Sequence, residues 1–374
     1  MKSDVFVLGA TGSIGYSSLK SIKKTNSKLI GFSFNKNLDR AIEIIREYNP
    51  EYILTFDNVS YNKIKNSFKN LFYGEDGLRE IISKLNKNTK FINGIYGTDG
   101  IKSSFIIAES GFDLLLANKE SLVMGGDVFT KKFTSSKLLP IDSEHWALFN
   151  ILRFIDKSHI KTFYLTASGG IVFKCNKDFK TLTIDDLKKH PVWDMGIEIT
   201  VNSSTMANKG LELIEAKELF NIDPNNIIVV IHPEAFVHSM VKLKSGAIIP
   251  YISNPDMCEP ITGALLYPEY YEDYFGIENK TFNFYSVDFK KYPMLELAYE
   301  VSKKGLAYHI CYTVSNEFFV REFIERRICF TDIYKNVYST LSKFKPDRVV
   351  SNIDDIFYLI DYSKDIVYKF LKKV

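Results

Sequence analysis

Long apolar runs are missing from this sequence of 374 residues, which carries a net charge of only +3. No run approaches the roughly 20 residues that a membrane-spanning helix needs, so we expect no membrane partner. The small net charge argues against a nucleic-acid or anionic-membrane surface. Cysteine is scarce as well, and its positions lack the spacing of a metal site or a disulfide framework, which favours a reducing cytoplasm: Cys175, Cys258, Cys311 and Cys329.

The first apolar segment, residues 3–8, runs directly into a glycine-rich turn and leaves no room for a signal peptide. The glycines of this turn are Gly9, Gly12 and Gly15, and an amphipathic helix follows through Ile22. Glycines at this spacing between a strand and a helix allow a tight turn and the close approach of a pyrophosphate to helix N–H groups. The segment therefore predicts a dinucleotide site.

The second predicted strand, residues 28–34, ends where such a site reads the adenosine ribose. An acidic residue at this point would favour NAD. The chain instead continues with donors and cations: Asn35, Lys36, Asn37 and Arg40. Because these groups suit a 2′-phosphate, we predict NADPH as the cofactor. Asp39 argues the other way, and the alternative is that the cations are merely solvated.

Three carboxylates stand in a pattern that a packed core does not need: Asp142, Glu144 and Glu212. The first two follow the apolar run 138–141, and at the end of a strand alternate residues would face one point. Glu212 lies in a predicted helix, 208–220, that is apolar around nearly its whole circumference and therefore buried. Such an all-oxygen group suits Mg²⁺ or Mn²⁺. The alternative is that the first two cap the following helix and Glu212 makes an ordinary ion pair.

Two further apolar strands end in polar residues. Residues 112–117 run into Asn118, Lys119 and Glu120, which would lie at the carboxyl edge of a sheet, where ligands bind in open α/β folds. Residues 163–167 run into Ser168 and two glycines, whose N–H groups can form an anion nest. Together with a second group of polar side chains, this turn would supply a phosphate cradle: Ser203, Asn208 and Lys209.

Strand and helix signals alternate over residues 1–139, which predicts a dinucleotide-binding domain. Residues 140–267 are mixed, with strands expected at 198–201 and 227–231 on either side of the helix 208–220. Residues 268–291 form a polar, aromatic connector. Residues 292–374 are helical, including segments 294–303 and 309–325.

Several long motifs occur in the order and spacing of the 1-deoxy-D-xylulose 5-phosphate reductoisomerase family, which the chain resembles from its first strand to Leu295. They are GATGSIG, LLANKES, PIDSEH, TASGG, KHPVWDMG, NSSTMANKGLE, HPEAFVHSMV and PDM. The resemblance implies a Rossmann-like N-terminal domain, a central α/β catalytic domain whose sheet pairs two subunits in a homodimer, and a C-terminal helical bundle. It also implies an NADPH- and metal-dependent enzyme that makes 2-C-methyl-D-erythritol 4-phosphate for isoprenoid precursors.

The resemblance assigns roles to individual residues. The metal ligands would be Asp142, Glu144 and Glu212, and Lys119 would lie between cofactor and phosphosugar. The remaining substrate contacts would be Ser143, Ser168, His190, Trp193, Ser203, Asn208 and Lys209, with Trp193 in a lid that closes over the substrate. The cofactor contacts would be Gly9, Thr11, Gly12, Ser13, Ile14, Asn35, Lys36, Asn37, Asn118, Glu120, Gly196 and Met257.

The chain departs from the family pattern at positions that spare these ligands. They are Ile171-Val172, Ile197-Glu198, Glu234-Ala235 and Asn35-Lys36-Asn37. Two rival functions fit the sequence less well. A semialdehyde dehydrogenase needs an activated cysteine, and Cys175 stands in a polar loop with no evident base. A cofactor-binding regulator that has lost catalysis would be expected to lose carboxylates first, and all three are present.

Overall fold

The computed structural model describes residues 3–175, 177–187, 196–273 and 275–371. Their contacts divide the chain into two compact units, each assembled from separate segments. Unit 1 consists of Met1–Ser121, Phe129–Trp146 and Asp256–Tyr274, and unit 2 of Leu122–Val128, Ala147–Pro255 and Phe275–Val374. The segment 256–274 thus belongs with the N-terminal unit, although the sequence alone groups most of it with the central part.

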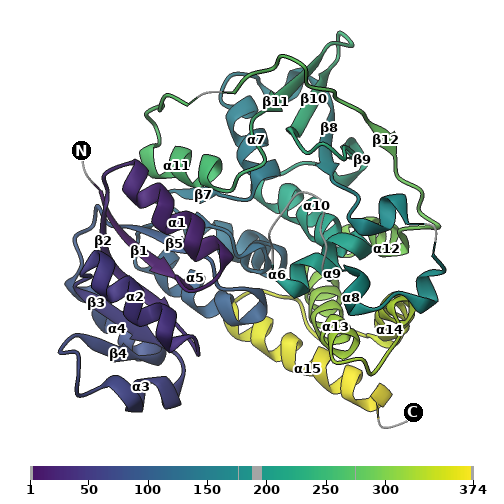
Figure 1. Ribbon diagram of the computed structural model, residues 1–374. Helices are drawn as coiled ribbons and strands as arrows, with labels where there is room; N and C mark the ends of the chain where they lie inside the picture. The colour runs from purple at the N-terminus through teal and green to yellow at the C-terminus, as the bar shows by residue number, and fades with distance from the viewer. Residues whose placement is uncertain (1–2, 176, 188–195, 274, 372–374) are drawn as a thin grey trace. The chain divides into compact units, whose positions relative to one another are not determined.

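Unit 1 is built on a seven-stranded sheet in the order β4-β3-β2-β1-β5-β6-β7, with every pair parallel (Figure 1). The chain builds outward from β1 to β4 and then returns to the other side of β1, which creates a topological switch point between β1 and β5. The strands are β1 (Asp4–Leu8), β2 (Lys28–Phe34), β3 (Tyr52–Thr55), β4 (Leu71–Tyr73), β5 (Lys90–Asn93), β6 (Asp113–Leu116) and β7 (Leu138–Pro140).

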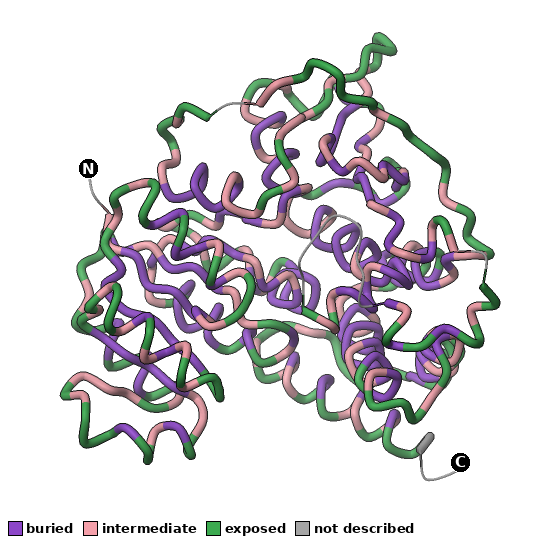
Figure 2. The backbone as a smooth tube through the Cα atoms, viewed as in Figure 1, coloured by how far each residue is buried: buried purple, intermediate pink, exposed green. Residues whose placement is uncertain are grey.

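The inner strands of this sheet are largely buried on both faces, as parallel strands normally are, whereas the edge strand β4 is partly exposed. Residues 5–8 of β1 are all fully buried, and the strand interiors are purple in Figure 2. The helices of the unit are α1 (Ser13–Lys24), α2 (Leu38–Tyr48), α3 (Asn58–Ile64), α4 (Gly74–Lys84), α5 (Ile101–Glu109) and α11 (Cys258–Leu266). Two helices are divided between the units: α6 (Lys119–Thr130) and α7 (Ser143–Leu152).

Unit 2 contains a five-stranded mixed sheet in the order β11-β10-β8-β9-β12, in which only β8 and β9 are parallel. Its strands are β8 (Ile160–Ala167), β9 (Ile227–Ile231), β10 (Val237–Leu243), β11 (Ile248–Ile252) and β12 (Tyr285–Ser286). The α-helices that lie wholly within it are α8 (Ile184–Leu187), α9 (Ile197–Thr205), α10 (Ala207–Phe220), α12 (Pro293–Ser302), α13 (Leu306–Ile324), α14 (Phe330–Lys343) and α15 (Ile353–Leu371).

The strand predicted at residues 198–201 is wrong, because this segment lies in helix α9. The β-branched run Ile-Thr-Val favours a strand locally. The buried positions instead follow helical spacing, with Thr200 and Val201 one turn before Ser204 and Thr205. Packing against the rest of unit 2 therefore overrides the local propensity. The strand predicted at residues 227–231 and the helix at 208–220 are confirmed, apart from one residue at the helix start.

Gly15 is required where α1 packs on the chain that enters it. A Cβ atom built at Gly15 would lie 2.2 Å from the carbonyl oxygen of Ala10, whereas one at Gly12 would lie 3.5 Å from its nearest neighbour. We expect Gly15→Ala to lower the free energy of unfolding by about 1–3 kcal/mol, because the backbone must shift to relieve the overlap. Thermal unfolding measures this, with Gly12→Ala as the matched control. Equal losses in the two variants would contradict the packing argument.

Candidate active site

The glycine-rich turn lies at the switch point of the seven-stranded sheet. Gly9 has φ +76°, a conformation that favours glycine, and a Cβ there would lie 3.1 Å from the backbone of Gly94, the residue after β5. The turn is fixed to β2, since the amide of Gly9 donates to Ser33 Oγ (2.9 Å) and that of Ala10 to the Ser33 carbonyl (2.9 Å).

The first turn of α1 follows directly, and no side chain caps it. Gly12 and Ser13 are exposed there, and Thr11 and Ile14 are half-buried. An uncapped helix start with exposed N–H groups at a switch point is suited to bind a pyrophosphate.

The polar residues after β2 are exposed, as the predicted adenosine end requires. Asn35, Lys36 and Asn37 all face solvent. Asn37 also caps α2, because its Oδ1 accepts from the amide of Arg40 (3.1 Å). The Arg40 guanidinium pairs with Glu43 at 2.6 Å. Lys36 is therefore the stronger candidate for a 2′-phosphate contact.

The end of β6 is tied into the protein by a buried amide. Asn118 Nδ2 donates to the carbonyls of Ile95 and Gly97, both at 2.8 Å, and to the Glu120 carboxylate at 3.0 Å. Its Oδ1 accepts from the amide of Ser121 at 3.1 Å. The Asn118 side chain thus holds the loop after β5 in place.

Lys119 and Asp142 form an ion pair at the sheet edge in unit 1. Lys119 Nζ lies 2.6 Å from Asp142 Oδ2, and both side chains are about one-seventh exposed, at 14% and 15%. His145, which is fully buried, has its Nδ1 4.0 Å from the same oxygen. In the sequence this histidine stands within the motif PIDSEH, without a predicted role of its own. Its position three residues after Asp142 at a helix start was the signal that it would lie beside the carboxylate.

Strand alternation does not place Asp142 and Glu144, and this part of the sequence interpretation is wrong. Strand β7 ends at Pro140, and Glu144 lies in the first turn of α7. The amide of Trp146 donates to the carbonyl of Asp142 (2.8 Å), so Asp142 precedes the helix as its cap residue. Ser143 Oγ donates to Glu144 Oε2 at 2.6 Å. Two carboxylates at a helix start also complement the helix dipole.

In unit 2, α10 carries three polar candidates on one turn. Glu212 is 1% and Lys209 5% exposed, and the two are ion-paired. Asn208 Nδ2 donates to the other carboxylate oxygen of Glu212 at 2.5 Å. The prediction that Glu212 is buried is confirmed. His238, also buried in this unit, is neutral because burial lowers its pKa to about 4, with the nearby Lys209 charge acting in the same direction.

The turn after β8 lies against α9 in the same unit. Gly169 and Gly170 have φ +81° and +57°, and the amide of Gly170 donates to Ser168 Oγ (3.3 Å). A Cβ on Gly170 would lie 3.0 Å from the Cα of Ser204, next to the predicted phosphate ligand Ser203. The turn and the carboxyl end of α9 are thus neighbours, as the phosphate cradle requires.

Four more residues belong to the predicted contacts. Gly196 is exposed directly before α9 in unit 2, and Met257 directly precedes α11 in unit 1. His190 and Trp193 lie outside the described residues, so their predicted roles stay predictions.

Within the described residues, no helix is both long enough and apolar enough to cross a membrane.

A glycine turn at the switch point of a parallel sheet, with lysine–carboxylate pairs at strand and helix ends, defines a nucleotide-dependent α/β enzyme. Three family models match, all described as 1-deoxy-D-xylulose 5-phosphate reductoisomerase or its C-terminal domains, over residues 5–126, 138–220 and 252–365. The chain belongs to the 1-deoxy-D-xylulose 5-phosphate reductoisomerase family, and it is an oxidoreductase.

Individual relatives support the assignment. The enzyme named 1-deoxy-D-xylulose 5-phosphate reductoisomerase from a Sulfurihydrogenibium species is 40% identical, covering 99% of this chain and 98% of its own length. That from Clostridium novyi is 38% identical over 94% and 95%. The motif-based recognition of the family is confirmed, and the semialdehyde dehydrogenase alternative is set aside.

Solved structures of reductoisomerases agree with the family assignment. A reductoisomerase in complex with NADPH, fosmidomycin and magnesium superposes with a TM-score of 0.91 at 31% identity, covering 99% of this chain and 98% of that one. The enzyme from Zymomonas mobilis in complex with NADPH gives 0.89 at 30% identity, with complete coverage of both chains. The predicted fold class is confirmed.

The buried amide of Asn118 generates a test that separates support from cofactor contact. We expect Asn118→Ala to lower the free energy of unfolding by about 1–3 kcal/mol, because the carbonyls of Ile95 and Gly97 lose their donor. Chemical denaturation measures this, with the exposed Asn35→Ala as control. Wild-type stability combined with weaker NADPH binding would show that the amide serves the cofactor instead.

Proposed function

We propose that this chain converts 1-deoxy-D-xylulose 5-phosphate to 2-C-methyl-D-erythritol 4-phosphate with NADPH and a divalent metal, Mg²⁺ or Mn²⁺, in the synthesis of isoprenoid precursors. The reaction is a rearrangement of the carbon skeleton followed by hydride transfer. The observation that carries the proposal is a pair of lysine–carboxylate contacts: Lys119–Asp142, which is half-buried, and Lys209–Glu212, which is buried. Both stand in the motifs that define the family.

The residues present fit a divalent cation. Asp142, Glu144 and Glu212 would hold it, since carboxylate oxygens are the ligands that Mg²⁺ and Mn²⁺ prefer. A buried carboxylate needs a cation, and ammonium groups fill that need at Asp142 and Glu212. When bound, the metal supplies Lewis-acid stabilisation of negative charge on the substrate oxygens.

The phosphate of the sugar would be bound in unit 2. Ser168 presents its hydroxyl from the turn after β8, and Ser203 lies on the adjoining helix α9. Asn208 and Lys209 add an amide and an ammonium from the first turn of α10. Holding the phosphate at the far end of the substrate fixes the position of the reacting carbons.

Lys119 is suited to act between cofactor and substrate. It begins α6 at the carboxyl end of β6, and Asp142 orients its ammonium at 2.6 Å. Its charge would stabilise an oxygen that becomes negative during the rearrangement. Because burial keeps His238 neutral, that residue adds no second positive charge beside Lys209.

The subunit assembly and the cellular location are also part of the proposal. We propose a homodimer formed through the sheet of unit 2, and its edge strand β11 supports this, because Ile248 there is 51% exposed. We also propose a cytoplasmic location, which the four free cysteines support.

The direct assay is NADPH oxidation on addition of 1-deoxy-D-xylulose 5-phosphate, with and without Mg²⁺ or Mn²⁺. We expect turnover only with substrate and metal together. Activity that is unchanged by a chelator would contradict the metal requirement.

Glu212→Gln tests the metal ligands. Turnover and metal affinity are expected to fall by at least about 100-fold, since even residues that only support a metal ligand contribute about 10- to 100-fold. From sequence alone, this variant is expected to fold normally because it leaves no unpaired carboxylate. The structure changes that expectation: Lys209 would be left buried without its carboxylate, so stability should fall as well.

The matched control is Glu215→Gln, on the same helix and equally buried at 1% exposure. It should retain metal affinity even if it loses stability. If Glu212→Gln and Glu215→Gln bound Mn²⁺ equally, the proposed metal site would be wrong.

Lys36→Ala tests the cofactor preference. Loss of an ammonium beside the 2′-phosphate should raise KM for NADPH by about tenfold and leave KM for NADH nearly unchanged. Lys65→Ala, another exposed lysine of unit 1, serves as control. An equal loss with both cofactors would assign Lys36 to the fold or to the pyrophosphate.

A further inference from the structure

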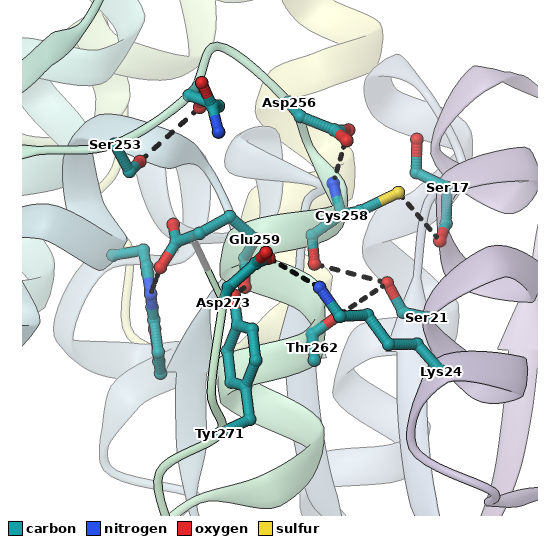
Figure 3. A network of polar contacts seen from close by, with 12 residues as sticks. Ser17, Ser21, Lys24, Ser253, Asp256, Cys258, Glu259, Thr262, Tyr271 and Asp273 are labelled. Atoms are coloured by element: carbon teal, nitrogen blue, oxygen red, sulfur yellow. Dashed lines mark hydrogen bonds and ion pairs between the residues drawn. The ribbon is translucent and has the colours of Figure 1, made fainter. Parts of the chain in front are cut away.

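Helix α11 is held against α1, the helix that follows the glycine-rich turn, although the two are far apart in sequence. Ser21 Oγ donates to the carbonyl of Cys258 (3.3 Å), and Thr262 Oγ1 donates to Ser21 Oγ (3.1 Å) (Figure 3). The Cys258 thiol donates to the carbonyl of Ser17 at 3.8 Å. Buried side chains thus join the two helices along one face of α11.

The carboxyl end of α11 is fixed by the sheet. Lys90, the first residue of β5, donates from Nζ to the carbonyls of Leu265 (2.6 Å) and Tyr267 (3.4 Å). An ammonium at this end also complements the helix dipole. Burial lowers the pKa of Lys90. Helix α11 is therefore a rigid part of unit 1, anchored both to α1 and to the strand beside β1.

A second set of contacts joins α11 to the start of α7. The Trp146 indole Nε1 donates to Glu259 Oε1 at 3.2 Å, and Trp146 is 4% exposed. A Cβ on Gly263 would lie 2.3 Å from Cζ2 of the indole, so the ring packs directly on the helix backbone. Tyr271, labelled with Glu259 in Figure 3, donates its hydroxyl to the Glu259 carbonyl at 3.3 Å.

Trp146 completes the first turn of α7, which carries two of the proposed metal ligands. Its amide donates to the carbonyl of Asp142 at 2.8 Å, and Glu144 lies within the same turn. A displacement of the Trp146 side chain would therefore be passed to both carboxylates through one helical turn.

We propose that Trp146 and Glu259 are positioning residues: through them α11 holds the carboxylates of α7 in a fixed position relative to α1, so that metal and NADPH bind cooperatively. This inference rests on the proposed function, in which Asp142 and Glu144 hold the metal and the start of α1 binds the cofactor. By thermodynamic linkage, each ligand tightens the other by the same factor.

The competing explanation is that Trp146 only fills space. Trp146→Phe separates the two, because it keeps an aromatic ring against Gly263 and removes the indole N–H. Glu259→Leu removes the acceptor, whereas Glu259→Gln keeps an oxygen in its place. Lys24→Met is the matched control, since it breaks an exposed ion pair with Asp273 (2.5 Å) in the same network.

The experiment measures Mn²⁺ binding to the full chain by electron paramagnetic resonance of free Mn²⁺, with and without saturating NADPH. A blank with NADPH alone corrects for metal bound by the cofactor. In the wild type we expect NADPH to tighten Mn²⁺ binding by about fivefold or more. In Trp146→Phe and Glu259→Leu this factor should fall to about one, with Mn²⁺ binding in the presence of NADPH weakened on the order of tenfold.

Glu259→Gln and Lys24→Met should retain the wild-type factor. The inference is overturned if NADPH tightens Mn²⁺ binding equally in Trp146→Phe and in the wild type, or if it has no effect in the wild type. Neither result would contradict the proposed metal site. Equal coupling factors in Glu259→Leu and Glu259→Gln would also overturn the inference, because the Trp146–Glu259 hydrogen bond would then make no contribution to the coupling. Mn²⁺ binding that survives Glu212→Gln rejects the proposed metal site, and the inference with it.

Discussion

A carboxylate that is removed from water has to be matched by a positive charge, and the candidate site is organised around this requirement. Lys119 meets Asp142 in unit 1, and Lys209 meets Glu212 in unit 2. Each lysine pairs with its carboxylate, and the proposed reaction assigns the same ammonium groups to the substrate.

The pairing also explains how these carboxylates are accommodated away from water. An unpaired Glu212, at 1% exposure, would protonate or destabilise the fold. Lys209 removes that cost from the same helical turn, and Asn208 bonds the second oxygen. Residues three and four positions before Glu212 thus stabilise its buried carboxylate within the proposed metal site.

Local patterns in the sequence predicted the elements that carry the site. The apolar segment 28–34 predicts a strand, and apolar residues around nearly the whole circumference of 208–220 predict a buried helix; the structure has both. Where β-branched residues favoured a strand in α9, helical burial spacing prevailed. Asp142 and Glu144 were predicted as neighbours for a reason that fails, because the chain turns from β7 into a helix between them. Residues two apart at a helix start do not face each other, so the expected convergence of the two carboxylates on one metal stays a prediction.

Contacts between distant segments lie beyond such patterns. Nothing in the local sequence of 256–274 indicates that it joins the N-terminal unit, because its partners Ser21 and Lys90 are more than 170 residues away. The glycine at position 263 shows the same limit. In sequence it is an unremarked glycine in a helix, where it costs stability relative to alanine. Only the indole of Trp146 against its backbone explains why no larger side chain fits. A residue whose role depends on a partner 117 positions earlier cannot be identified from its neighbours in the sequence.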